Sequence, residues 1–302
     1  MANDEPERRS GDTRDGGSSQ HPMAGVDSFS PGEIALLVQT RGVAKAGASA
    51  LTTLVLGVVA GAFIALGAVF STVVSTRSSL GDGPTRLLAG AAFSLGLILV
   101  VVAGAELFTG NNLIVMSWVG QKITLSRLLR NWAIVYVGNA IGAVSVVGLV
   151  YLSDWWVVAD HSMGATALSI AASKAALSFG EAFVRGILAN ALVCLAVWLA
   201  TAGRSLTDKV LAIMFPVTAF VAAGFEHSIA NMYFIPMGLL LSNKAVVVEV
   251  ANLSSDRLAG LDGAGLVTNL TAATLGNIVG GGVLVGLVYW FVYLRPQPAA
   301  SP

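Results

Sequence analysis

Long apolar runs separated by short polar segments make up most of the chain. A helix that crosses a bilayer needs roughly 20 predominantly apolar residues. Six runs meet that length, at residues 48–74, 87–119, 128–152, 179–199, 210–241 and 267–293. Polar residues interrupt the second and the fifth run. The pattern predicts an all-α integral membrane protein with six transmembrane helices, of which the second and fifth are broken.

The break in the fifth run reads GFEHSIANMYFIPMG and spans residues 224–238. It places Glu226, His227, Ser228 and Asn231 inside an otherwise apolar segment. An ionisable group at mid-membrane costs roughly 2.5 to 3.5 kcal/mol on insertion scales, so it normally faces a polar path. His227 is the side chain most easily moved between its neutral and charged forms there. The segment predicts a functional site, and a neutral histidine bonded to a backbone carbonyl is the alternative.

The break in the second run, GAELFTGNNL at residues 104–113, has the same skeleton as the break in the fifth. The corresponding pairs are Gly104 with Gly224, Glu106 with Glu226, and Asn111 with Asn231. A Gly-Asn-x-x-Gly motif follows each break, starting at Gly138 and at Gly276. Duplicated halves with corresponding broken helices indicate a transporter or channel site near the bilayer midplane. Coincidence within Gly- and Ala-rich helices is the alternative.

Composition supports a membrane protein. Charged residues make up 11% of the chain, against roughly 25% in soluble domains, and hydrophobic residues make up 55%. The 17 Lys and Arg residues balance the 17 Asp and Glu residues, so net charge indicates no nucleic-acid partner. Cys194 is the only cysteine, which leaves no internal disulfide and no Cys-based metal site. We therefore expect no metal and no cofactor.

The polar N-terminal segment, residues 1–30, has no apolar core of the signal-peptide kind. We expect it to be a disordered cytoplasmic tail, followed by a membrane domain at 31–297 and a short C-terminal tail at 298–302. Ser30 and Glu33 suit a capping box with Pro31 at the first helical position. They predict a short surface helix over 31–43, with an apolar side formed by Ile34, Leu36, Leu37 and Val38.

Lys and Arg residues indicate the orientation of the six spans. One side of the membrane would carry Arg41, Lys45, Lys122, Arg127, Arg130, Arg204, Lys209 and Arg295, and the other Arg77, Arg86, Lys174, Lys244 and Arg257. The richer side is normally cytoplasmic. Six spans place both termini on that side, so we expect cytoplasmic termini and a location in the cell (inner or plasma) membrane.

Two basic residues near the fourth span are candidates for anion attraction. Lys174 precedes the span on the outer side, and Arg185 lies within it. Together they predict an outer vestibule that concentrates small anions by its electric field. A structural ion pair between Arg185 and Glu181, one helical turn earlier, is the competing interpretation. Asn190, in the same span, is a further polar candidate.

Glu106 and Glu226 each precede the second half of a broken span. A carboxylate at that place can accept hydrogen bonds from backbone N–H groups that the break leaves free. We therefore favour a structural role for both glutamates.

Four segments together resemble the formate/nitrite transporter family: AELFTGNN at 105–112, NWAIVYVGNAIG at 131–142, ILANALVCLAVW at 187–198 and GFEHSIANMYFIPMG. The resemblance covers essentially the whole chain after the tail. It implies a six-helix, aquaporin-like inverted repeat that assembles as a homopentamer with one pore per protomer. The chain reads Glu106 and Gly110-Asn111-Asn112 where the best-known formate channels have Asp and a short Ser/Thr run.

The same resemblance implies roles for individual residues. A threonine in the break of the second span, Thr109, would interact with the central His227. The outer lysine would be Lys174, with Glu226 and Asn277 as its hydrogen-bond partners. The pore constrictions would be formed by Phe93, Leu97, Phe220 and Ala230 on the outer side and by Leu107 with Phe108 around the loop.

These features together lead to the hypothesis that the protein transports small monovalent weak-acid anions. Formate is the first candidate, followed by nitrite or a related monocarboxylate. An anion loses many kcal/mol of hydration in an apolar constriction, whereas protonating formate at neutral pH costs about 4.5 kcal/mol at about 1.36 kcal/mol per pK unit. Proton sharing near His227 is therefore the lower-energy route. The alternatives are a nitrite-preferring relative, a neutral-solute pore, a membrane-bound enzyme and a structural scaffold.

Overall fold

The computed structural model describes residues 27–296, so residues 1–26 and 297–302 of the predicted tails lie outside the described residues. No strand occurs among residues 27–296. The first half contains α1 (Pro31–Gly47), α2 (Ala50–Ser75), α3 (Asp82–Ala103), α4 (Phe108–Asn111), η1 (Asn112–Ile114), α5 (Val115–Val119) and α6 (Leu125–Leu152). The second half contains η2 (Trp155–Val157), α7 (Ser162–Ala175), α8 (Phe179–Ala202), α9 (Leu206–Ala222), α10 (Ser228–Leu241), α11 (Ala245–Ala251), α12 (Ser255–Leu258), α13 (Gly263–Asn277), η3 (Ile278–Leu287) and α14 (Val288–Tyr293).

The long helices coincide with the apolar runs. Five are long and apolar enough to cross a membrane: α2, α3, α6, α8 and the continuous segment Gly263–Tyr293. Helix α10 with α11, which bend by 111° at their junction, adds a possible sixth. Helix α3 ends before the second-run break, and α9 ends before the fifth-run break, after which α10 begins. The predicted all-α membrane fold with two broken spans is confirmed.

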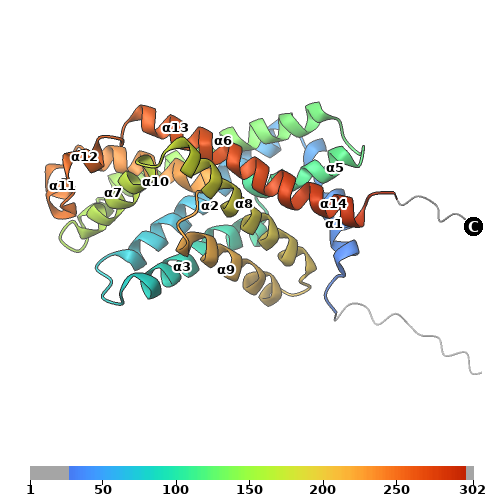
Figure 1. Ribbon diagram of the computed structural model, residues 1–302, viewed down its shortest axis with the longest axis horizontal. Helices are drawn as coiled ribbons and strands as arrows, with labels where there is room; N and C mark the ends of the chain where they lie inside the picture. The colour runs from blue at the N-terminus through green and yellow to red at the C-terminus, as the bar shows by residue number, and fades with distance from the viewer. Residues whose placement is uncertain (1–26, 297–302) are drawn as a thin grey trace, which may run out of the picture.

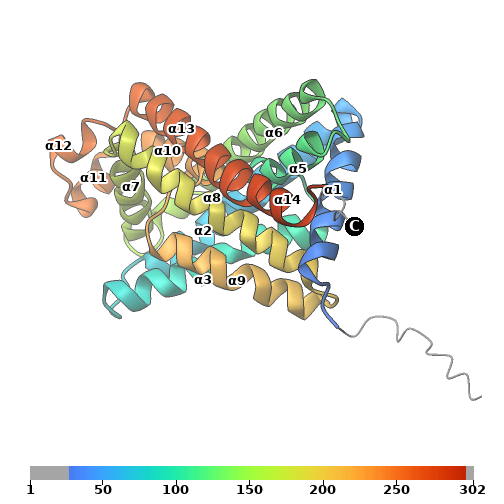
Figure 2. The same cartoon turned by 45° about the vertical axis from the view of Figure 1, so that its right-hand side comes forward.

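The two halves have the same internal arrangement. Helix α2 packs against α3 and α6, and α8 packs against α9 and α13 in the same way. The halves meet where α3 packs against α9 (Figure 1). Helices α1 and α7, the first helix of each half, lie at opposite ends of the molecule, and the two described chain ends lie together beside α1 (Figures 1 and 2). That both termini share one side of the membrane stays a prediction.

Helix α1 begins as the sequence predicts but packs differently. The Ser30 backbone N–H and hydroxyl both donate to the Glu33 carboxylate, at 2.8 and 2.7 Å. Ile34 and Val38 are buried, but Leu36 is 55% exposed, so its place in the predicted apolar side is wrong. The small residues Ala35 and Gly42 complete the buried stripe instead, because α1 rests closely on η1 and α5.

Residues 27–30 are also fixed in place, although they belong to the predicted disordered tail. The Phe29 N–H donates to the Ala202 carbonyl at 3.2 Å, and the Arg204 guanidinium lies 3.5 Å from the centre of the Phe29 ring. These contacts attach the start of α1 to the connection between α8 and α9.

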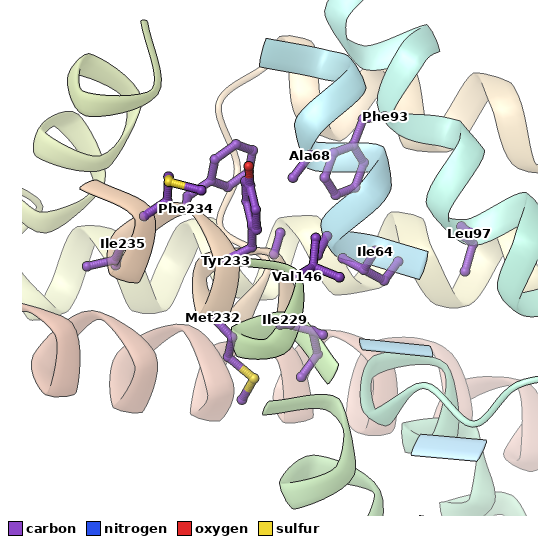
Figure 3. Packing of buried hydrophobic residues seen from close by; sticks show 14 of the residues in the cluster. Ile64, Ala68, Phe93, Leu97, Val146, Ile229, Met232, Tyr233, Phe234 and Ile235 are labelled. Atoms are coloured by element: carbon purple, nitrogen blue, oxygen red, sulfur yellow. The ribbon is translucent and has the colours of Figure 1, made fainter. Parts of the chain in front are cut away.

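The core holds the second half-helix of the fifth span in the middle of the bundle. Side chains of α10, including Ile229 and Tyr233, lie beside Ile64 and Ala68 of α2 and Val146 of α6 (Figure 3). All five are buried. The break residues that precede α10 are therefore held rigidly at the centre of the protein.

Candidate functional site

The two breaks begin with the same backbone device. Gly104 and Gly224 have φ values of 84° and 71°, in the left-handed region where glycine has no Cβ penalty. Helices α3 and α9 end at these turns. The chain then runs extended to Leu107 and His227, the residues that precede the second half-helices. Unwound backbone at this depth needs hydrogen-bond partners from elsewhere in the protein.

Two asparagines supply those partners. The Asn139 side chain accepts from the Phe108 N–H at 2.9 Å and donates to the Gly57 and Glu106 carbonyls at 2.8 and 2.9 Å. In the other half, the Asn277 side chain accepts from the Ser228 N–H at 2.9 Å. It donates to the Gly186 and Glu226 carbonyls at 2.8 and 2.9 Å. Asn277 thus braces the break, and its predicted bond to Lys174 is absent from the hydrogen bonds of the described residues.

Lys174 pairs with Glu226, as the family resemblance implies. Its Nζ lies 2.9 Å from Glu226 Oε1, and the two side chains are 17% and 3% exposed. Glu226 Oε2 accepts from the Asn231 and Asn269 amides at 2.6 and 3.2 Å. The Asn269 amide also donates to the Lys174 carbonyl at 3.0 Å. We call these four residues the Lys174 cluster; Asn269 was not identified from the sequence.

The first half contains a matching Lys45 cluster. Lys45 Nζ lies 3.2 Å from Glu106 Oε1 and donates to Asn111 Oδ1 at 2.8 Å. The Asn111 amide reaches Glu106 Oε2 at 2.6 Å and Asn131 Oδ1 at 3.0 Å, and the Asn131 amide donates to the Lys45 carbonyl at 3.3 Å. The predicted backbone N–H partners of the two glutamate carboxylates are therefore wrong, because lysine and asparagine side chains take that place.

A sequence signal for the Lys45 cluster exists. Lys45 precedes Gly57 by twelve residues, and Lys174 precedes Gly186 by the same number. Both glycines supply a carbonyl to the asparagine that braces the break. The repeat therefore begins at α1 and α7, earlier than the broken spans alone suggest.

His227 occupies the position that Leu107 has in the first half. Its Nε2 lies 2.9 Å from Thr109 Oγ1, so the predicted contact between the two breaks is present. Its Nδ1 accepts from the Ala230 backbone N–H at 3.1 Å. Because an amide N–H can only donate, the ring proton belongs on Nε2, which then donates to Thr109. This leaves the Thr109 hydroxyl hydrogen free to donate to another group.

Asn190 joins the break of the second span to the end of α13. Its amide nitrogen lies 3.2 Å from the Thr109 carbonyl, 2.7 Å from Asn112 Oδ1 and 2.6 Å from the Asn277 carbonyl. The side chain is fully buried. Asn190 therefore holds Thr109 in place rather than facing a cavity.

Two cavities approach His227 and Leu107 from different sides. The Lys174 cavity, about 420 Å³, is lined by Lys174, Glu226, Arg86, Arg185, Phe93, Phe220, His227, Ala230 and Phe234, among others. The Lys45 cavity, about 360 Å³, is lined by Lys45, Glu106, Arg41, Lys209, Leu97, Leu107 and Gly110, among others. His227 thus faces one cavity and Leu107 faces the other, and the Thr109–His227 contact lies between the two breaks.

The predicted constriction residues divide between these cavities. Phe93 and Phe220 pack edge to face with ring centres 5.8 Å apart, and Phe220 stacks on His227 at the same distance. Leu97 lines the Lys45 cavity, so its predicted outer position is wrong. Phe108 lines neither cavity, because its ring packs against Trp132 and Tyr136.

Arg185 is half-buried at the wall of the Lys174 cavity. Among the described residues, no Glu181 carboxylate oxygen lies within 4.0 Å of an Arg185 nitrogen, so the competing ion pair is absent. Glu181 Oε2 instead accepts from the Ser178 N–H and hydroxyl at 2.9 and 2.7 Å. Residues 27–296 also contain no group of three or more His, Cys, Asp or Glu side chains that could hold a metal ion.

Comparison with known proteins gives consistent matches over this architecture. Residues 32–291 match the family model described as formate/nitrite transporter. The chain is 43% identical over 273 residues to the formate channel FocA of Escherichia coli K12, covering 89% of this chain and 96% of that protein. It is 38% identical over 274 residues to the formate channel FocA of Haemophilus influenzae, with coverages of 89% and 96%. The solved structure of a pentameric formate channel with formate bound matches with a TM-score of 0.75 and 41% identity, covering 82% of this chain and 98% of that one.

Proposed function

Because the chain belongs to the formate/nitrite transporter family, we propose that it is a transmembrane channel for small monovalent weak-acid anions, with formate preferred over nitrite. The observation that carries the proposal is that two cavities end at the paired breaks, one lined by His227 and the other by Leu107, while His227 contacts Thr109 of the opposite break. The two similar proteins from Escherichia coli and Haemophilus influenzae, both formate channels, support formate as the substrate. The pentameric state of the matching formate channel structure supports a homopentamer.

The proposed orientation follows the distribution of Lys and Arg residues. Cytoplasmic termini place the Lys45 cavity on the cytoplasmic side and the Lys174 cavity on the outer side of the cell membrane. An anion entering from outside passes Phe93 and Phe220 before it reaches His227. The aromatic rings exclude hydrated ions, because an ion must lose water to pass an apolar constriction.

His227 and Thr109 then act on the anion directly. In the proposed mechanism the Nε2–H of His227 or the hydroxyl of Thr109 donates to a carboxylate oxygen of formate. Sharing a proton with the anion lowers the cost of crossing the apolar layer, because neutralising formate costs about 4.5 kcal/mol at neutral pH, far less than moving a bare charge into low dielectric. The Ala230 N–H on Nδ1 holds the ring in the orientation that this step requires.

Flux from purified protein in liposomes tests the proposal. We expect formate uptake that rises as external pH falls, and uptake at least tenfold lower for His227→Ala, because a hydrogen bond to an ion contributes about 1.5 to 3 kcal/mol. His161→Asn is the matched control, since His161 lines neither cavity. Formate uptake that is unaffected by His227→Ala and by pH would contradict the mechanism.

The same liposomes separate the alternatives. Nitrite that outcompetes formate at equal concentration would indicate the nitrite-preferring relative. Water or glycerol flux without formate flux would indicate a neutral-solute pore, and liposomes that pass none of these solutes would indicate a structural scaffold.

A further inference from the structure

The ion pair of the Lys174 cluster leaves little net charge at that place. Lys174 and Glu226 lie 2.9 Å apart, so beyond a few ångströms their opposite charges largely cancel. The charged residues that line the cavity are Lys174, Arg86 and Arg185 on the positive side and Glu226 alone on the negative side. Three cations and one carboxylate leave an excess of two positive charges, and these belong to Arg86 and Arg185.

Arg86, on α3, is directed to the end of α9. Its Nη1 lies 3.5 Å from the Ala222 carbonyl, beside the turn at Gly224. The C-terminal end of a helix carries partial negative charge, which would repel an approaching anion. Arg86 offsets that charge at the entrance, and no carboxylate lies within 4.0 Å of it among the described residues.

Arg185 is not required by the duplicated framework. Its backbone carbonyl accepts from the Glu226 N–H at 3.3 Å, and in the first half the Leu56 carbonyl accepts from the Glu106 N–H at 3.2 Å. In the first half, the same backbone hydrogen bond is therefore made by a residue whose side chain is apolar. An arginine that the architecture does not need, half-buried at the wall of the cavity without a carboxylate within 4.0 Å in residues 27–296, indicates a functional role.

We propose that Arg86 and Arg185, rather than Lys174, recruit the anion and form a carboxylate-binding station at the outer end of the path. The inference rests on the proposed function and specifies which residues of the Lys174 cavity select for negative charge. Guanidinium groups keep their charge across the physiological pH range and match the geometry of a carboxylate. Recruitment is therefore independent of pH, whereas passage beside His227 is not.

Formate uptake into liposomes, measured against formate concentration at low and high salt, tests the station. For the double variant R86Q/R185Q we expect the apparent KM to rise about tenfold at low salt, because the anion loses the attraction of two positive charges that salt partly screens. The KM of this variant should depend less on salt concentration than the wild-type KM does. Its uptake rate at saturating formate should stay within about twofold of wild type, and the pH dependence of uptake should be unchanged. The double variant R86K/R185K should retain most of the wild-type affinity and salt dependence.

Two controls separate the arginines from their neighbours. R77Q removes an outer arginine that pairs with Asp160 at 3.2 Å and lines neither cavity, and it should leave KM unchanged. K174Q/E226Q removes the ion pair without changing net charge, and it should keep the salt dependence. Wild-type KM and salt dependence in R86Q/R185Q, or loss of the salt dependence in K174Q/E226Q alone, would overturn the inference.

Direct binding separates this inference from the proposed function. Line broadening of ¹³C-formate by the purified protein should be reduced in R86Q/R185Q and retained in R77Q. A protein that passes no formate yet broadens the line in this arginine-dependent way would refute the channel and keep the station. Broadening that is equal in wild type and R86Q/R185Q would refute the station whatever the flux.

Discussion

The Lys45 and Lys174 clusters are built alike, and the residues next to them are not. In both, a lysine at the end of a short helix pairs with the break glutamate, and two asparagines complete the network. The following position is Leu107 in one half and His227 in the other. The duplicated parts hold the unwound backbone, whereas the residues that can act on a solute differ between the halves. The comparison thus distinguishes residues that support the backbone of the breaks from residues that can contact a solute.

Removing a lysine should affect the two clusters unequally. Lys174→Met leaves the Glu226 carboxylate, 3% exposed, without its partner, which should cost about 3 to 5 kcal/mol of stability. Lys45→Met should cost less, because Glu106 is 13% and Lys45 34% exposed. Thermal unfolding in detergent measures both. Lys174→Met combined with Glu226→Gln should recover most of the loss, because the uncharged glutamine oxygen can still accept from the Asn231 and Asn269 amides. Equal effects of the two single changes would show that burial of the glutamate does not set the cost.

The bracing asparagines should behave as equivalents. Asn139→Leu and Asn277→Leu each remove three hydrogen bonds to buried backbone groups, and leaving such groups unsatisfied should cost about 3 kcal/mol in each half. Asn243→Leu is the control, since its side chain makes a single exposed hydrogen bond, to the Leu239 carbonyl in the last turn of α10. Unfolding temperatures that fall for one variant only would show that the halves are braced differently.

Replacing His227 by the leucine found at the matching position of the first half should reduce formate transport and preserve the fold. His227→Leu should lower formate flux about 10- to 100-fold, because it removes a hydrogen bond to an ion worth about 1.5 to 3 kcal/mol, while the unfolding temperature changes little. Adding Leu107→His should not restore flux, since Ile229 stands where the mirrored ring would need Thr109. Recovery in the double variant would show that only the presence of an imidazole matters.

The starts of α1 and α7 differ as well, with the smallest expected effect. Hydrogen bonds from the Ser30 hydroxyl and N–H lower the pKa of Glu33 from its ordinary value of 4.5. A lowered carboxyl pKa means that the cap stabilises the helix above that ordinary value and is lost as pH falls through the folded-state value. Proteolysis near residue 30 should therefore increase below pH 4.5, and Glu33→Ala should abolish that pH dependence. Helix α7 follows His161, which makes no side-chain capping hydrogen bond, and should show no such change.

Much of the fold was predictable because hydrophobic periodicity and the repeated motif are local signals. The six apolar runs and both breaks were predicted from these signals, the Thr109–His227 contact was implied by the family resemblance, and all of them are observed. The resemblance to the formate/nitrite transporter family is confirmed. Helix α7 was not predicted because it is short, with 14 residues, and rich in small side chains.

The errors concern which way side chains face. Leu97 lies one turn after Phe93 and was predicted to face the same cavity, yet it faces the other, and Phe108 turns into the core. Apolar residues near a break look alike in sequence, because only packing decides which of them line a path. Asn131 and Asn269 each complete a network from a distant helix. They were missed although each lies eight residues before the asparagine that braces a break, Asn139 or Asn277, so the repeat itself marks them.

The central claim of the proposed function is that the two cavities open on opposite faces of the membrane, with Leu107, Thr109 and His227 in the layer that separates them. Single cysteines at Ser173 and Val101, one lining each cavity, can be probed with a membrane-impermeant thiol reagent in a Cys194→Ala background. The account predicts that Ser173→Cys reacts only from the outer face and Val101→Cys only from the cytoplasmic face. Reaction of both from the same face, or of neither, would contradict it.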